Sequence, residues 1–372
     1  QSHASFRAEI RRQSSGRASL GSSSGLSRSS SPYELQRTTS IPWSDASHDV
    51  GESVLKAPIA REPTMPFAWQ VDLKTVKKTA TIRCHTDTVN AMCCSQDGSL
   101  LYTASSDTTA RVIDAKSSQA IRSVANVCSM AVSGIAPLTM PNNSAALDAV
   151  LVLSSWDNEV YVYSPAYGRV LQTLDAHDDA VSCLAVRHSV MATGSWDTNL
   201  RVWAVRESNI ETNAIGGIEF DDELRCVSID ATGFSVVGGA ADGSLMLYDT
   251  RVGHEVQAWH QHTDAITGVS LTRDGTRIVS CGEDGSFRVF DVRGGGQVFA
   301  HDCHVPLKCL VSDDYTLMVG DEIGNISAFT LASGATVKTF NDAHDTSVQS
   351  MAASSDGQLL ASAGKDGIVC LW

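Results

Sequence analysis

The chain has 372 residues, a net charge of −14 and 42% hydrophobic residues. It contains no apolar run of about 18 residues, which excludes a membrane-spanning helix, and its acidic balance argues against nucleic-acid binding, which needs a positive face. The ten cysteines form no C-x-x-C pair and no zinc spacing, so we expect no metal site, no cofactor and a cytoplasmic protein with reduced thiols.

The N-terminal region, residues 1–65, is rich in Ser and Arg and poor in apolar residues, so we expect a disordered linker. Residues 1–40 carry a net charge of +4, which leaves −18 for the rest of the chain. The chain opens on Gln1 without a signal-peptide pattern, and we expect it to be part of a longer protein. Arg-directed patterns and one Ser-Pro pair mark phosphorylation candidates, although such linkers also match these patterns by chance; the candidates are Ser14, Ser19, Ser31 and Ser40.

A repeat occupies residues 75–372. In each copy an Asp in a polar turn is followed six residues later by a bulky apolar residue, at intervals of 39 to 50 residues; a seventh copy has Ile323 in place of the Asp. Units of this length with four short strands are typical of β-propeller blades, which bury their faces only against one another. The sequence therefore predicts an all-β, seven-bladed propeller. The six complete pairs are Asp107/Ile113, Asp157/Tyr163, Asp197/Trp203, Asp242/Tyr248, Asp284/Phe290 and Asp366/Trp372.

The order of strands also predicts how the ring closes. In each blade a fourth strand precedes the next polar turn, as residues 170–174 precede His177. A matching segment, residues 76–83, stands before the first blade, whereas the last blade stops at Trp372 after its third strand. We expect residues 76–83 to supply the outer strand of blade 7 and so close the ring.

A His lies 20 to 22 residues before the turn Asp in four blades. With a nearby Ser or Thr this could suggest a hydrolase triad, but a triad occurs once per active site, whereas this arrangement repeats. We interpret the pairs as structural ties that satisfy buried polar groups. Blade 2 lacks the His, blade 4 has Phe220 there, and blade 6 keeps His301 but lacks the Asp, so we expect blade 6 to be held most loosely. The four pairs are His85/Asp107, His177/Asp197, His262/Asp284 and His344/Asp366.

Two tryptophans form the candidate binding site. Trp156 and Trp196 each stand directly before the turn Asp, in neighbouring blades 2 and 3. Partly exposed Trp is favoured at binding hot spots, so the pair predicts an anchor for a protein or peptide. The alternative is that both rings only pack against neighbouring loops. Acidic residues around the pair favour a basic partner; they are Asp87, Asp178, Asp179, Asp264 and Glu283.

The motifs Ser195-Trp196-Asp197…Trp203 and Ser362…Asp366…Trp372 resemble WD40 repeats. Residues 154–183 and 194–203 further resemble the C-terminal propeller of BEACH-domain proteins, and in particular of members linked to neutral sphingomyelinase. This resemblance implies a covalently linked upstream BEACH domain and a non-catalytic protein-interaction scaffold. It also implies a role in membrane trafficking, lysosome organisation or receptor-linked sphingomyelinase signalling, at endomembranes through the full-length protein.

Two other functions stay open. One is a substrate receptor or subunit of another multiprotein complex, such as a ubiquitin ligase, because a fold does not fix a function. The other is an enzyme built on a propeller, but no isolated His, Glu or Cys cluster stands out to support it. Strong direct membrane binding is not expected, because anionic lipids repel an acidic ring.

Overall fold

The structure, a computed structural model, describes residues 76–138, 149–206, 209–354 and 357–372. The predicted linker and its four phosphorylation candidates lie outside the described residues and stay predictions. Every regular element in the described ranges is a β-strand. Accordingly, no helix in this part of the chain is long and apolar enough to cross a membrane.

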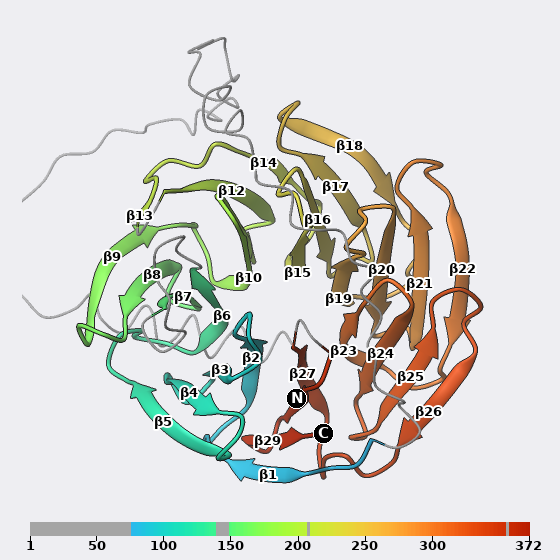
Figure 1. The fold of residues 1–372 in the computed structure, drawn as a ribbon. Helices are drawn as coiled ribbons and strands as arrows, with labels where there is room; N and C mark the ends of the chain where they lie inside the picture. The colour runs from blue at the N-terminus through green and yellow to red at the C-terminus, as the bar shows by residue number, and fades with distance from the viewer. Residues whose placement is uncertain (1–75, 139–148, 207–208, 355–356) are drawn as a thin grey trace, which may run out of the picture. The chain divides into compact units, whose positions relative to one another are not determined.

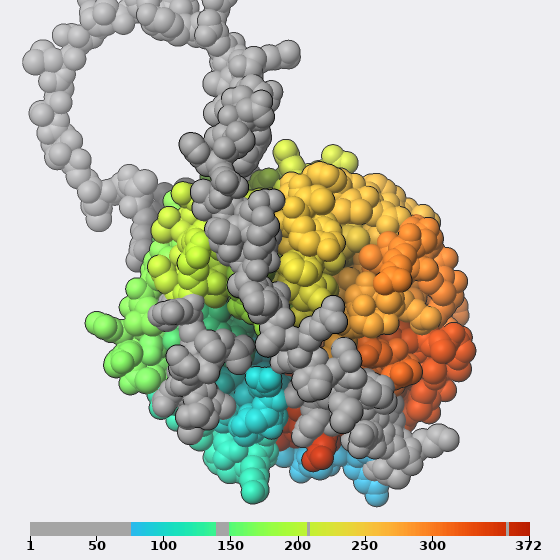
Figure 2. Space-filling view, turned by 45° about the horizontal axis from the view of Figure 1, so that its top comes forward, coloured from blue at the N-terminus to red at the C-terminus, as the bar shows by residue number. Residues whose placement is uncertain are grey.

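The strands form seven antiparallel sheets that follow one another around a central axis (Figure 1). The innermost strand of each sheet contacts the innermost strand of the next, and the last sheet contacts the first. This arrangement confirms the predicted all-β, seven-bladed propeller. The space-filling view shows the blades following each other in chain order, with the blue start of the described chain beside its red end (Figure 2).

The blades are built as follows, from the inner to the outer strand. Blade 1 consists of β2 (Val89–Cys94), β3 (Leu100–Ser105), β4 (Ala110–Asp114) and β5 (Gln119–Val124). Blade 2 consists of β6 (Val132–Leu138), β7 (Val150–Ser155), β8 (Glu159–Ser164) and β9 (Arg169–Asp175). Blade 3 consists of β10 (Val181–Arg187), β11 (Val190–Ser195), β12 (Asn199–Arg206) and β14 (Gly216–Glu219), and β13 (Asn209–Ile210) pairs with the end of β12.

The remaining blades follow the same order. Blade 4 consists of β15 (Leu224–Ile229), β16 (Ser235–Ala240), β17 (Leu245–Asp249) and β18 (His254–Trp259). Blade 5 consists of β19 (Ile266–Leu271), β20 (Arg277–Gly282), β21 (Ser286–Asp291) and β22 (Gln297–Asp302). Blade 6 consists of β23 (Leu307–Ser312), β24 (Thr316–Asp321), β25 (Ile326–Thr330) and β26 (Thr336–Phe340). Blade 7 consists of β27 (Val348–Ala353), β28 (Leu360–Gly364), β29 (Ile368–Leu371) and β1 (Ala80–Arg83).

The outer strand of blade 7 comes from the start of the described chain. β1 pairs antiparallel with β29, from Ala80 opposite Leu371 to Arg83 opposite Ile368 (Figure 1). The residues before β1 add further contacts: Lys78 Nζ donates to Ala343 O at 2.7 Å, and Lys338 Nζ from blade 6 donates to Val76 O at 2.7 Å. The segment 76–83, which we call the latch, therefore contacts both blade 7 and blade 6.

The hydrophobic core lies between the blades. The second strands are buried on both faces, as in β3, β7 and β11, because each face packs against a neighbouring sheet. Outer strands alternate instead, as β1 and β14 do, because one face meets solvent. Large side chains fill the joints: Phe287 of blade 5 lies 4.8 Å from Phe329 of blade 6, centroid to centroid. Burial of one such ring contributes about 2–3 kcal/mol.

Every innermost strand carries a β-bulge at its second residue. In four blades this bulge residue links two blades by donating to the first carbonyl of the next innermost strand. The four bonds run from Asn90 to Val132 (2.9 Å), Ser133 to Val181 (2.6 Å), Ser182 to Leu224 (2.7 Å) and Thr267 to Leu307 (2.8 Å). In blade 6 the bulge residue is Lys308, whose Nζ reaches Glu283 Oε1 of blade 5 at 3.0 Å.

Candidate functional site

The predicted site residues lie at one end of the ring. In a sheet of four antiparallel strands, the turn between the second and third strands lies at the same end as the connection that leaves the fourth. We call this end the tie face; it consists of those turns and of the loops that join successive blades. All predicted ties and all predicted partner-binding residues lie in these turns and loops.

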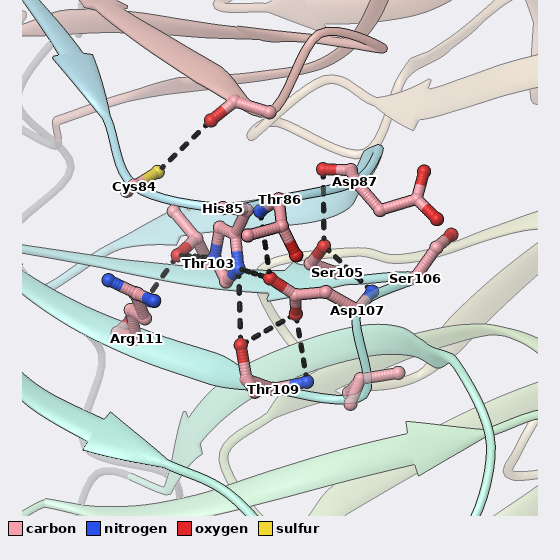
Figure 3. Close-up of polar contacts among 12 residues, drawn as sticks. Cys84, His85, Thr86, Asp87, Thr103, Ser105, Ser106, Asp107, Thr109 and Arg111 are labelled. Atoms are coloured by element: carbon pink, nitrogen blue, oxygen red, sulfur yellow. Dashed lines mark hydrogen bonds and ion pairs between the residues drawn. The ribbon is translucent and has the colours of Figure 1, made fainter.

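Blade 1 shows the geometry of a tie (Figure 3). His85 Nδ1 lies 2.9 Å from Asp107 Oδ2, and His85 Nε2 lies 2.9 Å from Thr103 Oγ1 on β3. Asp107 also accepts hydrogen bonds from the backbone N–H of Thr86 at 3.1 Å and of Thr109 at 3.0 Å. One carboxylate therefore contacts both the loop that enters the blade and the turn inside it.

Blades 3 and 5 repeat this geometry. In blade 3, His177 lies 2.9 Å from Asp197 and 2.8 Å from Thr193, whose hydroxyl also accepts from Trp203 Nε1 at 2.9 Å. In blade 5, His262 Nδ1 lies 2.9 Å from Asp284 Oδ2, and its Nε2 lies 2.7 Å from the hydroxyl of Ser280. The Trp at the end of the motif thus extends the hydrogen-bonded chain in blade 3.

The tie of blade 7 is weaker. His344 Nε2 lies 2.8 Å from Ser362 Oγ, which also accepts from Trp372 Nε1 at 3.0 Å. However, His344 Nδ1 lies 3.8 Å from Asp366 Oδ1 and has no hydrogen-bond partner among the described residues. The spacing of 22 residues between His344 and Asp366 is the same as in blades 1 and 5, so the longer distance is not predictable from the sequence.

The hydroxyl–His–Asp order matches a hydrolase triad in distance, but not in access. Thr103, Thr193, Ser280 and Ser362 are completely buried, so a substrate carbonyl cannot reach their oxygens. Burial lowers the pKa of His85, His262 and His344, which keeps these rings neutral inside the fold. Although burial opposes ionisation of Asp107, hydrogen bonds from Thr109 and His85 lower its pKa to about 2.

The even-numbered blades use other residues. The loop position of the tie histidine, four residues before each innermost strand, holds Cys128 in blade 2, Phe220 in blade 4 and Cys303 in blade 6. In blade 2, Ser129 of the entering loop donates its N–H and its hydroxyl to Asp157 Oδ2 at 2.8 and 2.9 Å. The hydroxyl of Tyr161 on β8 lies 2.9 Å from the same oxygen and 2.5 Å from Glu159 Oε2, so Ser129 and Tyr161 together take the place of the missing His. The signal in the sequence is a Tyr four residues after the turn Asp, where blades 1, 3 and 5 carry Arg.

Blade 6 differs from the sequence interpretation. His301 does not occupy the tie position, which Cys303 holds; it lies on β22 and stacks on Phe287 with ring centroids 5.2 Å apart. The turn is held by Asp321, which stands two residues before Ile323. The Asp321 carboxylate accepts a hydrogen bond from the backbone N–H of Asn325 at 2.7 Å. The Ile323 side chain is exposed. The turn thus keeps a carboxylate, displaced by two residues.

The two tryptophans of the predicted anchor are in contact. The ring centroids of Trp156 and Trp196 lie 5.6 Å apart with the planes tilted by 36°, and both residues are half-buried. Their backbones are fixed, because Trp156 N donates to Ala131 O and Trp196 N to Ala180 O, each at 3.0 Å. We call these two rings the Trp pair.

The predicted acidic residues divide into two sets. Asp178 and Asp179 lie in the loop entering blade 3, beside the turn that carries Trp196, and the Asp178 side chain is 92% exposed. Asp87 and Asp264 lie in the loops entering blades 1 and 5, and Glu283 pairs with Lys308 across the joint between blades 5 and 6. The structure therefore brings only the blade 3 acids together with the Trp pair.

The described residues offer no group of three or more His, Cys, Asp or Glu that could hold a metal ion. All ten cysteines are free thiols. Burial raises the pKa of Cys281 to about 12 and that of Cys303 to about 11, so neither thiol is activated as a nucleophile.

Comparisons with known proteins agree with the repeats. The WD domain, G-beta repeat family model matches residues 76–114 and 334–372, and the Nucleolar protein 10-like, N-terminal domain model matches residues 143–312. The chain contains WD40 repeats.

Three curated proteins are similar in sequence to parts of this chain. Autophagy-related protein 16 of Arabidopsis thaliana is 26% identical over 288 residues, 73% of this chain and 53% of that protein. WD repeat-containing protein 81 of Rattus norvegicus is 30% identical over 122 residues, 31% of this chain and 6% of that protein. BEACH domain-containing protein B of Arabidopsis thaliana is 28% identical over 126 residues, 28% of this chain and 5% of that protein. The chain thus spans about half of the first relative and a small part of the other two.

Proposed function

We propose that this seven-bladed WD40 propeller is a non-catalytic protein-interaction scaffold that captures a protein partner on its tie face through the Trp pair. The observation that carries the proposal is the contact between Trp156 and Trp196, two half-buried rings held next to each other by neighbouring blades. Truncation of a Trp at the centre of an interface commonly costs 2 kcal/mol or more, ~30-fold in affinity.

The His–Asp ties of the tie face argue against catalysis. The one hydroxyl–His–Asp arrangement of the tie face is repeated from blade to blade, and its hydroxyls are completely buried. A catalytic nucleophile has to meet its substrate. A purified chain that carries stoichiometric zinc or calcium would contradict this part of the proposal.

The test is quantitative affinity capture with the double variant Trp156→Ala/Trp196→Ala. The matched control is Glu322→Ala/Lys365→Ala, which removes the exposed side chains at the same turn position in blades 6 and 7. We expect the Trp variant to lose its specific partners while its unfolding midpoint stays close to that of the control. Partner recovery unchanged from the parent would refute the proposal.

We further propose that the chain belongs to a larger protein with a BEACH domain ahead of the propeller, acting in membrane trafficking or lysosome organisation at endomembranes. The match to BEACH domain-containing protein B and the resemblance of residues 154–183 support this. The narrower similarity, to the factor associated with neutral sphingomyelinase activation, rests on that resemblance alone. The reading frame upstream of Gln1 tests the proposal, because a frame without a BEACH domain contradicts it.

A further inference from the structure

At one position of the tie-face turns the side chain differs from blade to blade, whereas the backbone hydrogen bond is the same in every blade. The residue directly before the turn Asp, or before Ile323 in blade 6, is called the pre-turn residue. It donates its N–H to a carbonyl of the loop that enters the same blade, at 2.8 to 3.0 Å in all seven blades. Its side chain carries no part of this bond. The pre-turn residues in blade order are Ser106, Trp156, Trp196, Ala241, Glu283, Glu322 and Lys365.

Chemistry at this position divides the tie face into sectors. The pre-turn residues of blades 5, 6 and 7 are charged, whereas those of blades 2, 3 and 4 are Trp, Trp and Ala. Among the pre-turn residues, those of blades 2 to 4 are therefore the ones that offer an apolar surface to a partner; the blade 6 turn adds the single exposed side chain of Ile323. The neighbouring bulge residues Ser133 and Ser182 are small, and their hydroxyls are used across the blade joints. The two rings pack on each other instead of being covered by long side chains from these positions.

Negative charge lies directly beside this apolar sector. The loop entering blade 3 carries Asp178 and Asp179, and the loop entering blade 4 carries residues 221–223, which are Asp, Asp and Glu. Two guanidinium groups face these five carboxylates: Arg201 lies 3.8 Å from Asp178, and Arg225 lies 3.4 Å from the acid at position 223. The two loops thus keep a net negative charge next to the Trp pair.

We propose that the tie face recognises an extended peptide segment that carries an aromatic or aliphatic anchor next to a run of Lys or Arg. The anchor packs on the Trp pair, and the basic residues lie over the loops that enter blades 3 and 4. This inference rests on the proposed function and specifies the partner of that same site. Charge complementarity selects the basic segment, because phosphate groups of nucleic acid or of an anionic membrane are repelled by the same carboxylates.

Binding of four synthetic peptides to the full chain tests this proposal. One joins Phe-Leu to four alternating Arg and Lys residues, the second replaces the basic residues by Glu, the third replaces Phe-Leu by Ala-Ala, and the fourth carries both replacements. Fluorescence anisotropy of a labelled peptide gives the affinity. The chain has seven Trp, so the part of the Trp quenching that is lost in Trp156→Ala/Trp196→Ala reports occupancy of the Trp pair. We expect the first peptide to bind at least about tenfold more tightly than the others, with an affinity that falls as salt rises.

Three variants separate the two contributions. Trp156→Ala/Trp196→Ala should reduce binding of the first peptide to the level of the Ala-Ala peptide. Asp178→Asn/Asp179→Asn should weaken it and flatten the salt dependence; Asn keeps the side-chain oxygen that accepts from Ala180 N at 2.8 Å in the parent, so the loop is expected to fold. The control Glu322→Ala/Lys365→Ala should bind like the parent.

The inference is overturned if no peptide binds, if the Glu peptide binds as well as the basic one, or if the Asn variant leaves the salt dependence unchanged. These failures are distinct from failure of the proposed function. If affinity capture still depends on the Trp pair, the tie face binds proteins of another chemistry. If affinity capture does not depend on the Trp pair, the proposed function itself falls.

Discussion

The latch allows a sharp test, because its removal opens the ring at one joint. Ile82 is half-buried and packs against the core between blades 7 and 1, whereas Arg83, the next residue of β1, is exposed. We predict that Ile82→Asp detaches β1 from β29. Arg83→Asp, which places a carboxylate on the solvent side of the same strand, is the matched control.

The magnitude follows from burial. Full burial of an Ile side chain is worth about 1.5–3 kcal/mol, so half-burial of Ile82 contributes about 1 kcal/mol. A polar group forced into this position costs a further ~2 kcal/mol. The total of about 3 kcal/mol raises the population of the open latch ~100-fold.

Thiol labelling, followed peptide by peptide with mass spectrometry, measures this opening. Cys370 lies on β29 opposite Thr81 of the latch and is 1% exposed, and Cys281 lies in blade 5 and is 0% exposed. In Ile82→Asp we expect labelling of Cys370 to accelerate ~100-fold while labelling of Cys281 keeps its parent rate. In Arg83→Asp both rates should stay close to the parent.

Two results would refute the reasoning. If both cysteines accelerate together in Ile82→Asp, the ring unfolds as a whole and the latch is not a separable element. If the two variants label Cys370 equally fast, burial of the Ile82 side chain does not hold the latch.

Three further predictions concern the ties. Tyr161→Phe removes the hydroxyl that lies between Asp157 and Glu159 in blade 2, and we expect a loss of about 1–2 kcal/mol in the free energy of unfolding, measured by urea denaturation. Asp197→Asn should lower the thermal midpoint more than Asp366→Asn, because its carboxylate lies 2.9 Å from its His and the other 3.8 Å; equal shifts would contradict this. Burial lowers the pKa of His85 and His262, so below pH ~6.5 these residues bind protons in the unfolded chain but not in the folded one. The stability that is present above pH ~6.5 should therefore be lost as the pH falls below it. We expect a lower urea midpoint at pH ~5.5 than at pH ~7.5.

The fold could be predicted because its main signal is repeated. A bulky apolar residue six positions after a polar turn recurs seven times, and each copy supports the others, so a weak signal in one blade does not change the number of blades. The broken copy at Ile323 still forms a four-stranded sheet, because its apolar strands pack between blades 5 and 7.

Individual contacts were less predictable, because a polar group can be satisfied from more than one place. In blade 2 the turn carboxylate accepts from Ser129 of the preceding loop and also from Tyr161 on β8. In blade 6 the carboxylate itself stands at Asp321 instead of two residues later. Residue spacing alone placed His301 at the tie, whereas the loop position is held by Cys303 and His301 stacks on Phe287.

Pairing across blade joints was also invisible in the linear sequence. Glu283 was expected to contribute to an acidic partner surface, but its carboxylate lies 3.0 Å from the Lys308 ammonium of the next blade. The two residues are 25 positions apart, and packing of the neighbouring sheets of blades 5 and 6 brings them together. The contact between Trp156 and Trp196, 40 positions apart, likewise depends on packing of the neighbouring sheets of blades 2 and 3.

The way in which each sequence repeat contributes its strands to two sheets has a consequence for the evolution of the number of blades. Each period of the sequence begins with the fourth strand of one sheet and continues with three strands of the following sheet, and β1 with β29 shows that the two free ends of this arrangement match. A duplication or loss of one whole period would therefore leave the same complementary ends, still able to pair. Chain connectivity does not set the number of sheets; the packing of innermost strands around the axis does.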